Sequence, residues 1–137
     1  MGRAVKAGGL YFVLIFGLGF VLGTVRTLLI EPRVGLGTAT LVELPVMLVA
    51  SWLACGWVIR RLAVPRQASA RLVMGSVAFL LLMAGELGVS TLLMGRTVAE
   101  HVATYAEPAR QWGLAAQVAF ALFPLLRRQA APSASRA

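Results

Sequence analysis

Four strongly polar residues interrupt the apolar stretches of this 137-residue chain and are the first candidates for chemistry. They are Arg26, Glu43, Glu86 and Gln117. Burial away from water favours the protonated form of a carboxyl group, and an arginine beside it supplies a permanent counter-charge. Such a combination suits a proton-coupled transport site, and the same residue types also build structural hydrogen-bond networks. The four residues therefore predict a polar cluster that either handles a solute or fixes helix packing.

Four apolar segments must position this cluster. Hydrophobic residues make up 59% of the chain and charged residues only 13%, and the mean hydropathy is +0.83. A helix needs about 20 apolar residues to cross about 30 Å of hydrocarbon. The segments 10–30, 38–59, 72–94 and 109–126 are continuously apolar, which favours helices. The sequence predicts an all-α polytopic membrane protein with one antiparallel four-helix transmembrane domain, residues 1–128, and a disordered tail, residues 129–137.

The basic residues predict how the chain is oriented in the membrane. Nine of them, without any acidic residue, fall on one side of the four spans: Arg3, Lys6, Arg60, Arg61, Arg66, Arg71, Arg127, Arg128 and Arg136. The opposite side carries three arginines and three glutamates. Because positive loops stay in the cytoplasm, we expect both termini there and the protein in the cell inner membrane. The net charge of +8 serves topology and anionic lipid headgroups, so no nucleic-acid partner is expected.

The supply of reactive side chains argues against an enzyme. Cys55 is the only cysteine and His101 the only histidine. One chain therefore offers neither two histidines for haem nor a Cys/His set for zinc, and we expect no cofactor and no metal. Residues 96–107 are expected to form a short amphipathic helix at the interface, with His101 solvated in this outer loop. Pro108 suits the first turn of the fourth span.

The spacing of the polar residues predicts how they meet. At about 1.5 Å per residue, all four lie within about 6–12 Å of the outer ends of their spans. A lone charge at lipid depth costs at least about 2.5 kcal/mol, so the charged groups should turn toward one another. We expect Arg26 to pair with Glu43, and Glu86 to join this pair through a hydrogen bond or a water, with Gln117 nearby.

Proline and small residues refine this arrangement. If Pro45 lies inside the second helix, it frees the carbonyl of Leu41 as a further acceptor. If that helix begins near Leu44, Pro45 is a first-turn proline and Glu43 caps the helix. Gly75 shares a helix face with Glu86, and small residues mark faces where helices approach closely in lipid.

The chain resembles a family of small, uncharacterised four-span bacterial inner-membrane proteins. The resemblance is carried by Thr-Val-Arg-Thr-Leu-Leu-Ile-Glu-Pro-Arg at 24–33 and Leu-Val-Glu-Leu-Pro at 41–45. It implies a fold and a membrane location, but no activity. In size and number of spans the chain is also similar to the small multidrug resistance transporters. Their essential carboxylate lies in the first helix, where this chain has Arg26.

Two functions are consistent with these features. Short loops leave no room for a soluble domain, so an accessory or structural subunit would meet a membrane-protein partner through its helices within the lipid bilayer. Alternatively, the chain is a small proton-coupled transporter or channel-like protein that acts as a homo-oligomer, because four short helices enclose little solvent. We expect the subunit function, with the transporter as the alternative.

Overall fold

The computed structural model describes residues 2–129, and every regular element in that range is helical. The elements are α1 (Gly2–Val25), the π-helical turn η1 (Arg26–Ile30), α2 (Glu31–Leu62), α3 (Ala68–Gly88), the π-helical turn η2 (Val89–Leu93), α4 (Val98–Ala103), the 3₁₀ turn η3 (Thr104–Ala106) and α5 (Pro108–Gln129). The expected all-α fold is thus confirmed for this part of the chain. Gln129 ends α5, and the remainder of the expected tail lies outside the described residues.

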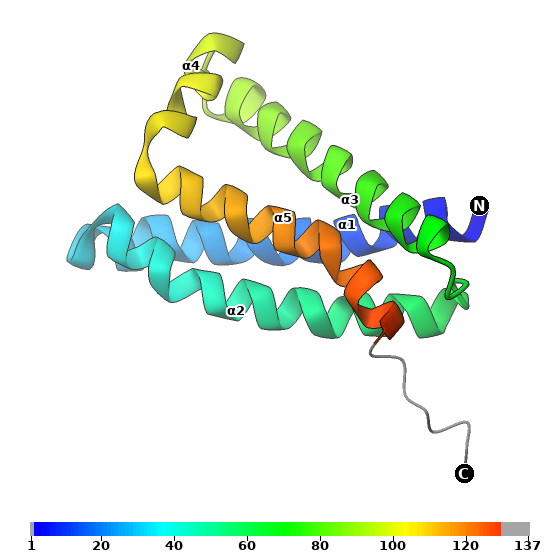
Figure 1. The fold of residues 1–137 in the computed structure, drawn as a ribbon. Coiled ribbons are helices and arrows are strands. Elements are labelled where there is room, and N and C mark those ends of the chain that lie inside the picture. The colour runs from blue at the N-terminus through cyan, green and yellow to red at the C-terminus, as the bar shows by residue number, and fades with distance from the viewer. Residues whose placement is uncertain (1, 130–137) are drawn as a thin grey trace.

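A single glycine near the start of α2 reverses the direction of the chain after α1 and η1. Gly35 has φ 86° and ψ 162°, a conformation that residues with a side chain rarely adopt. Helical hydrogen bonding is otherwise continuous from α1 through η1 into α2. After Gly35 the chain runs back alongside α1, and α5, which runs back from α4, lies beside α2 and points in the same direction as α2 (Figure 1). The reversal leaves the N-terminus of α1 and the C-terminus of α5 at the same end of the molecule, with α4 at the other (Figure 1).

The four long helices of the described range pack in a ring. α1 contacts α3, α3 contacts α5, α5 contacts α2, and α2 contacts α1. The core lies in the half of the ring nearest the termini, where Tyr11, Cys55, Val58 and Met74 are fully buried. Figure 1 shows α3 diverging from the other long helices toward the α4 end. This end therefore leaves room that the core half does not.

A proline inside α5 explains how the buried hydroxyl of Tyr11 is satisfied. Pro124 lies within the helix and has no N–H, so it cannot bond the carbonyl of Phe120 four residues earlier. The Tyr11 hydroxyl donates to this carbonyl at 2.8 Å, and the rings of Tyr11 and Phe120 stack with centroids 4.1 Å apart. The carbonyl that Pro124 leaves without a partner inside α5 thus accepts a hydrogen bond that ties α1 to α5.

Arg71 is buried, contrary to its expected place in a basic loop. α3 begins at Ala68, before the predicted span, so Arg71 lies in its first turn and is only 3% exposed. Its guanidinium donates to the carbonyl oxygens of Pro65 at 3.0 Å and Pro124 at 3.1 Å. Arg71 therefore ties the loop after α2 to the end of α5, because a buried cation needs acceptors close by.

Two helical segments are long and apolar enough to cross a membrane. They are Gly2–Leu62, which contains the Gly35 reversal, and Ala68–Leu93. Their most apolar 18-residue stretches have mean hydropathies of 2.2 and 2.0. Only 6% and 22% of the residues in these stretches are buried inside the protein. Apolar surface is therefore turned outward along both segments.

α3 and α5 approach so closely at Gly75 that one added methyl group should destabilise the fold. A Cβ added at Gly75 would overlap the carbonyl oxygen of Ala121, which is backbone and cannot swing aside. We expect Gly75→Ala to lower the free energy of unfolding by about 1–3 kcal/mol, the usual cost of overpacking. The measurement is reversible unfolding in mixed micelles, followed by circular dichroism.

Gly88→Ala is the matched control for this substitution. Gly88 belongs to the same helix, and nothing lies within 4 Å of the position its Cβ would occupy. Because alanine favours helix over glycine by up to about 1 kcal/mol, stability should be unchanged or slightly raised. Equal effects of the two variants would contradict the close packing at Gly75.

Candidate functional site

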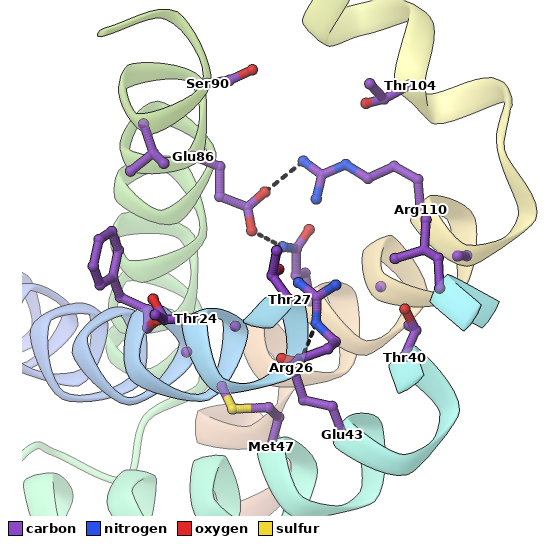
Figure 2. A pocket seen from close by; sticks show the side chains of 18 of the residues that line it. Thr24, Arg26, Thr27, Thr40, Glu43, Met47, Glu86, Ser90, Thr104 and Arg110 are labelled. Atoms are coloured by element: carbon purple, nitrogen blue, oxygen red, sulfur yellow. Dashed lines mark hydrogen bonds and ion pairs between the residues drawn. The ribbon is translucent and has the colours of Figure 1, made fainter. Parts of the chain in front are cut away.

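A cavity of about 680 Å³, lined by both polar and apolar side chains, occupies the end of the molecule that carries α4. Residues of α1, η1, α2, α3, η2, α4 and α5 all contribute to its wall. Figure 2 shows Arg26 and Glu43 on one side of it and Glu86 and Arg110 on the other. Arg26, Glu43, Glu86 and Gln117 all line this one space. The cavity therefore gathers the four polar residues singled out in the sequence.

Arg26 joins η1 to α2 through two carboxylates. Its Nε donates to Glu43 at 2.7 Å, and its Nη1 lies 3.4 Å from Glu31. The side chains of Arg26 and Glu43 are 25% and 20% exposed, so solvent reaches the pair. Pro45 lies inside α2, which confirms the first of the two placements considered for it. Glu43 consequently projects from the helix wall instead of capping a helix start.

Glu86 pairs with Arg110 and not with Arg26. The Nη2 atom of Arg110 donates to Glu86 Oε1 at 2.7 Å, and the side-chain amide of Gln117 donates to Glu86 Oε2. Arg110 also donates to the Tyr105 hydroxyl at 3.0 Å and lies over the Tyr105 ring, 4.6 Å from its centroid. The expected link between Glu86 and the Arg26 pair is thus replaced by a second, separate pair.

In the sequence, Arg110 counts among the charges on the side opposite the termini, and its pair with Glu86 was not predicted. The signal was present, because Arg110 and Gln117 are seven residues apart and lie within about 20° on one helix face. With helix starts uncertain by a few residues, charge position alone does not separate a loop arginine from one in a first turn. Here α5 begins at Pro108, as expected, and Arg110 falls inside it.

Both charge pairs lie beside π-helical turns. Arg26 is the first residue of η1, and Ser90 belongs to η2, which directly follows the helix that carries Glu86. A π turn places one extra residue in the helical turn and frequently occurs at functional sites. Ser90 and Arg26 both line the cavity. The two turns therefore reorient side chains where α1 and α3 meet the cavity.

The outer loop covers one side of the cavity. α4 begins with a capping box, in which Thr97 and Glu100 exchange hydrogen bonds of 2.7 and 3.1 Å. His101 is 7% exposed, so the expectation that it is solvated was wrong. Its ring packs edge-on against Tyr105, with centroids 5.7 Å apart. Burial and the nearby positive charge of Arg110 lower the pKa of His101 below its usual value.

A double-mutant cycle measures the interaction energy between Glu86 and Arg110, the charge pair that joins α3 and α5. Glu86→Gln and Arg110→Met each remove one charge, and each single substitution leaves the other group without its counter-ion. We expect a coupling energy of about 0.6–1.7 kcal/mol from unfolding in mixed micelles, the range found for polar pairs between membrane helices. Additive single effects would show that Glu86 and Arg110 do not stabilise each other.

His101 predicts a pH dependence of the outer loop. Its pKa is lower in the folded chain than the ordinary 6.5, so the unfolded loop binds more protons between these two values. The stability of the loop should be complete above about pH 6.5 and fall as the pH drops through the folded pKa. Hydrogen exchange of the α4 amides checks this. His101→Gln should remove the pH dependence; an unchanged pH profile in that variant would refute the assignment.

Comparisons with protein families, with curated proteins and with solved structures give no match to this chain. In the described range, no three histidine, cysteine, aspartate or glutamate side chains gather as metal ligands would.

Proposed function

We propose that this protein is a polytopic inner-membrane protein whose four long helices form an antiparallel transmembrane bundle with both termini in the cytoplasm. The outward-facing apolar surface supports this, because soluble monomers rarely expose large contiguous apolar patches. The Gly35 reversal divides Gly2–Leu62 into two passes. α5 is the most polar of the four, and it supplies Arg110 and Gln117 to the cavity. The resemblance to small four-span bacterial proteins agrees with this placement.

Within that setting, the protein binds a small solute in the cavity and couples its binding to a proton. One observation carries this function: the paired charges border a cavity of about 680 Å³ instead of filling it. Ligand sites typically have volumes of about 300–1,000 Å³. An ion-pair network that served only to stabilise the fold would be expected to leave no cavity beside it, because an unfilled space contributes no packing contacts.

Glu86 is the group that couples solute and proton. Its two carboxylate oxygens accept from Arg110 and Gln117, which both belong to α5. A proton on Glu86 would remove its negative charge and turn one acceptor into a donor. The attraction between α3 and α5 would then weaken at the cavity mouth, so protonation would change the width of the site.

An accessory subunit is the second candidate, and the closed inner half favours it. Phe120 lines the cavity, and beyond it lie the fully buried side chains of Tyr11, Met74 and Pro124. A solute bound in the cavity would reach the other side only if this core opened or if a partner or a second copy completed the path. Purification in mild detergent separates the cases, because a subunit retains a fixed membrane partner and a carrier forms a homo-oligomer.

Cysteine labelling tests both the orientation and the proton coupling. In a Cys55→Ala background, Gly113→Cys places a thiol in the cavity wall, where nothing lies within 4 Å of its Cβ. A membrane-impermeant methanethiosulfonate should label it in spheroplasts and not in inverted vesicles. Acidification should change the labelling rate, and adding Glu86→Gln should make the rate match that of the protonated protein at every pH.

Two comparisons make the labelling result decisive. The ratio of rates with and without Glu86→Gln, taken at each pH, cancels the titration of the thiol itself. Gly88→Cys, which has open space around it and does not line the cavity, should react far more slowly with the impermeant reagent. A ratio that stays constant with pH would refute proton coupling, and labelling only in inverted vesicles would refute the orientation.

A further inference from the structure

Four buried polar atoms around the cavity have no hydrogen-bond partner within residues 2–129. They are Ser90 Oγ, His101 Nδ1, Arg110 Nε and Gln117 Oε1. More than nine in ten buried polar atoms in proteins are paired, so four unpaired atoms in one place call for an explanation. All four residues line the same cavity, and Ser90 and His101 are only 3% and 7% exposed. Figure 2 shows Ser90 pointing into the space between α3 and the segment that carries Thr104.

The chemistry of these atoms restricts what can satisfy them. The Nε atom of Arg110 carries a hydrogen and can only donate. The amide nitrogen of Gln117 is held by Glu86, so its Oε1 is left to accept. The Ser90 hydroxyl can do either, and His101 Nδ1 donates or accepts according to which ring nitrogen carries the hydrogen. A ligand that satisfies the set must therefore both accept and donate, as a hydroxyl or a primary amide does.

The charges of the cavity restrict the ligand further. Arg110 is paired with Glu86, and Arg26 contacts both Glu43 and Glu31, so each of these two arginines already has a carboxylate. Arg96 and Glu107 also line the cavity, whose wall carries three arginines and four glutamates. An anion would compete with the glutamates for their arginines, and a cation would compete with the arginines for their glutamates. Either ion would leave a partly buried charge without its partner, which is costly at low dielectric. An uncharged ligand leaves both pairs intact.

The rest of the cavity wall is apolar. Phe16, Phe20, Leu82 and Phe120 line the cavity together with the polar groups. Sites of this kind hold the ligand body by apolar contact and orient it with a few polar groups. We propose that the cavity binds an uncharged solute that carries a hydroxyl or primary amide on an apolar body. This proposal rests on the solute-binding function and specifies its ligand class.

Three probes of nearly equal shape and different charge test the proposal. Benzamide is neutral, benzoate is an anion and benzamidinium is a cation at pH 7. Their binding to the full-length protein in phosphatidylcholine nanodiscs is measured by saturation-transfer nuclear magnetic resonance. We expect benzamide to bind at least about tenfold more tightly than either ion. Ser90→Ala should weaken benzamide about fivefold, which corresponds to the loss of one hydrogen bond.

Matched leucine variants separate the cavity from the lipid as the place of binding. Gly113→Leu fills the cavity without a backbone clash and should abolish saturable binding, whereas Gly88→Leu points into open space and should leave binding unchanged. Thermal unfolding of both variants checks that they remain folded. Benzamide binding that survives Gly113→Leu would overturn the proposal, because the probe would then lie elsewhere.

The outcomes distinguish this proposal from the proposed function. Tighter binding of benzoate or benzamidinium, abolished by Gly113→Leu, would overturn the uncharged ligand and leave solute binding in place. If no probe shows binding that depends on Gly113, the ligand class is wrong, and the cysteine labelling described above decides separately whether the cavity is open and linked to protons.

Discussion

The pairing of Arg110 with Glu86 is the interaction on which the polar end of the molecule depends. It is the contact between charged groups that joins α3 to α5 at the point where α3 diverges from the other helices. Charges held away from bulk water are stable only with a counter-charge and satisfied hydrogen bonds. Gln117 and Tyr105 supply those additional bonds. The pair holds α3 and α5 together beside the cavity, in addition to the close backbone packing of the two helices at Gly75.

The half of the molecule near the termini is closely packed, whereas the half near α4 contains the cavity. In the half near the termini, Gly75 and Gly8 let backbones approach, and the Tyr11 hydroxyl uses the carbonyl that Pro124 leaves free. In the other half, the π turns and the Gly35 reversal direct polar side chains into a cavity. Close packing in one half gives a rigid base, and the irregular backbone in the other makes room for a ligand.

A solute site built in this way differs from a site made only of charges. The ion pairs neutralise each other and set the shape of the wall, while the unpartnered atoms of Ser90, Gln117 and Arg110 are left for recognition. The proposed function assigns the proton coupling to Glu86, which also holds α5 through Arg110 and Gln117. Binding and protonation would therefore act on one set of contacts, which is the physical basis of coupling between them.

The sequence by itself determined the helical class, the approximate position of the four long helices and four of the polar residues that line the cavity. These follow from continuous apolar length and from the few polar residues within it, which are properties of local sequence. The Arg26–Glu43 contact was also expected, because both residues lie near the ends of consecutive segments.

Only the tertiary structure decided the partner of Glu86, the burial of His101 and Arg71, and the existence of the cavity itself. Each of these depends on which helices are neighbours in the ring and where one of them diverges. Such relations join residues far apart in the chain, so periodicity along a single helix does not specify them.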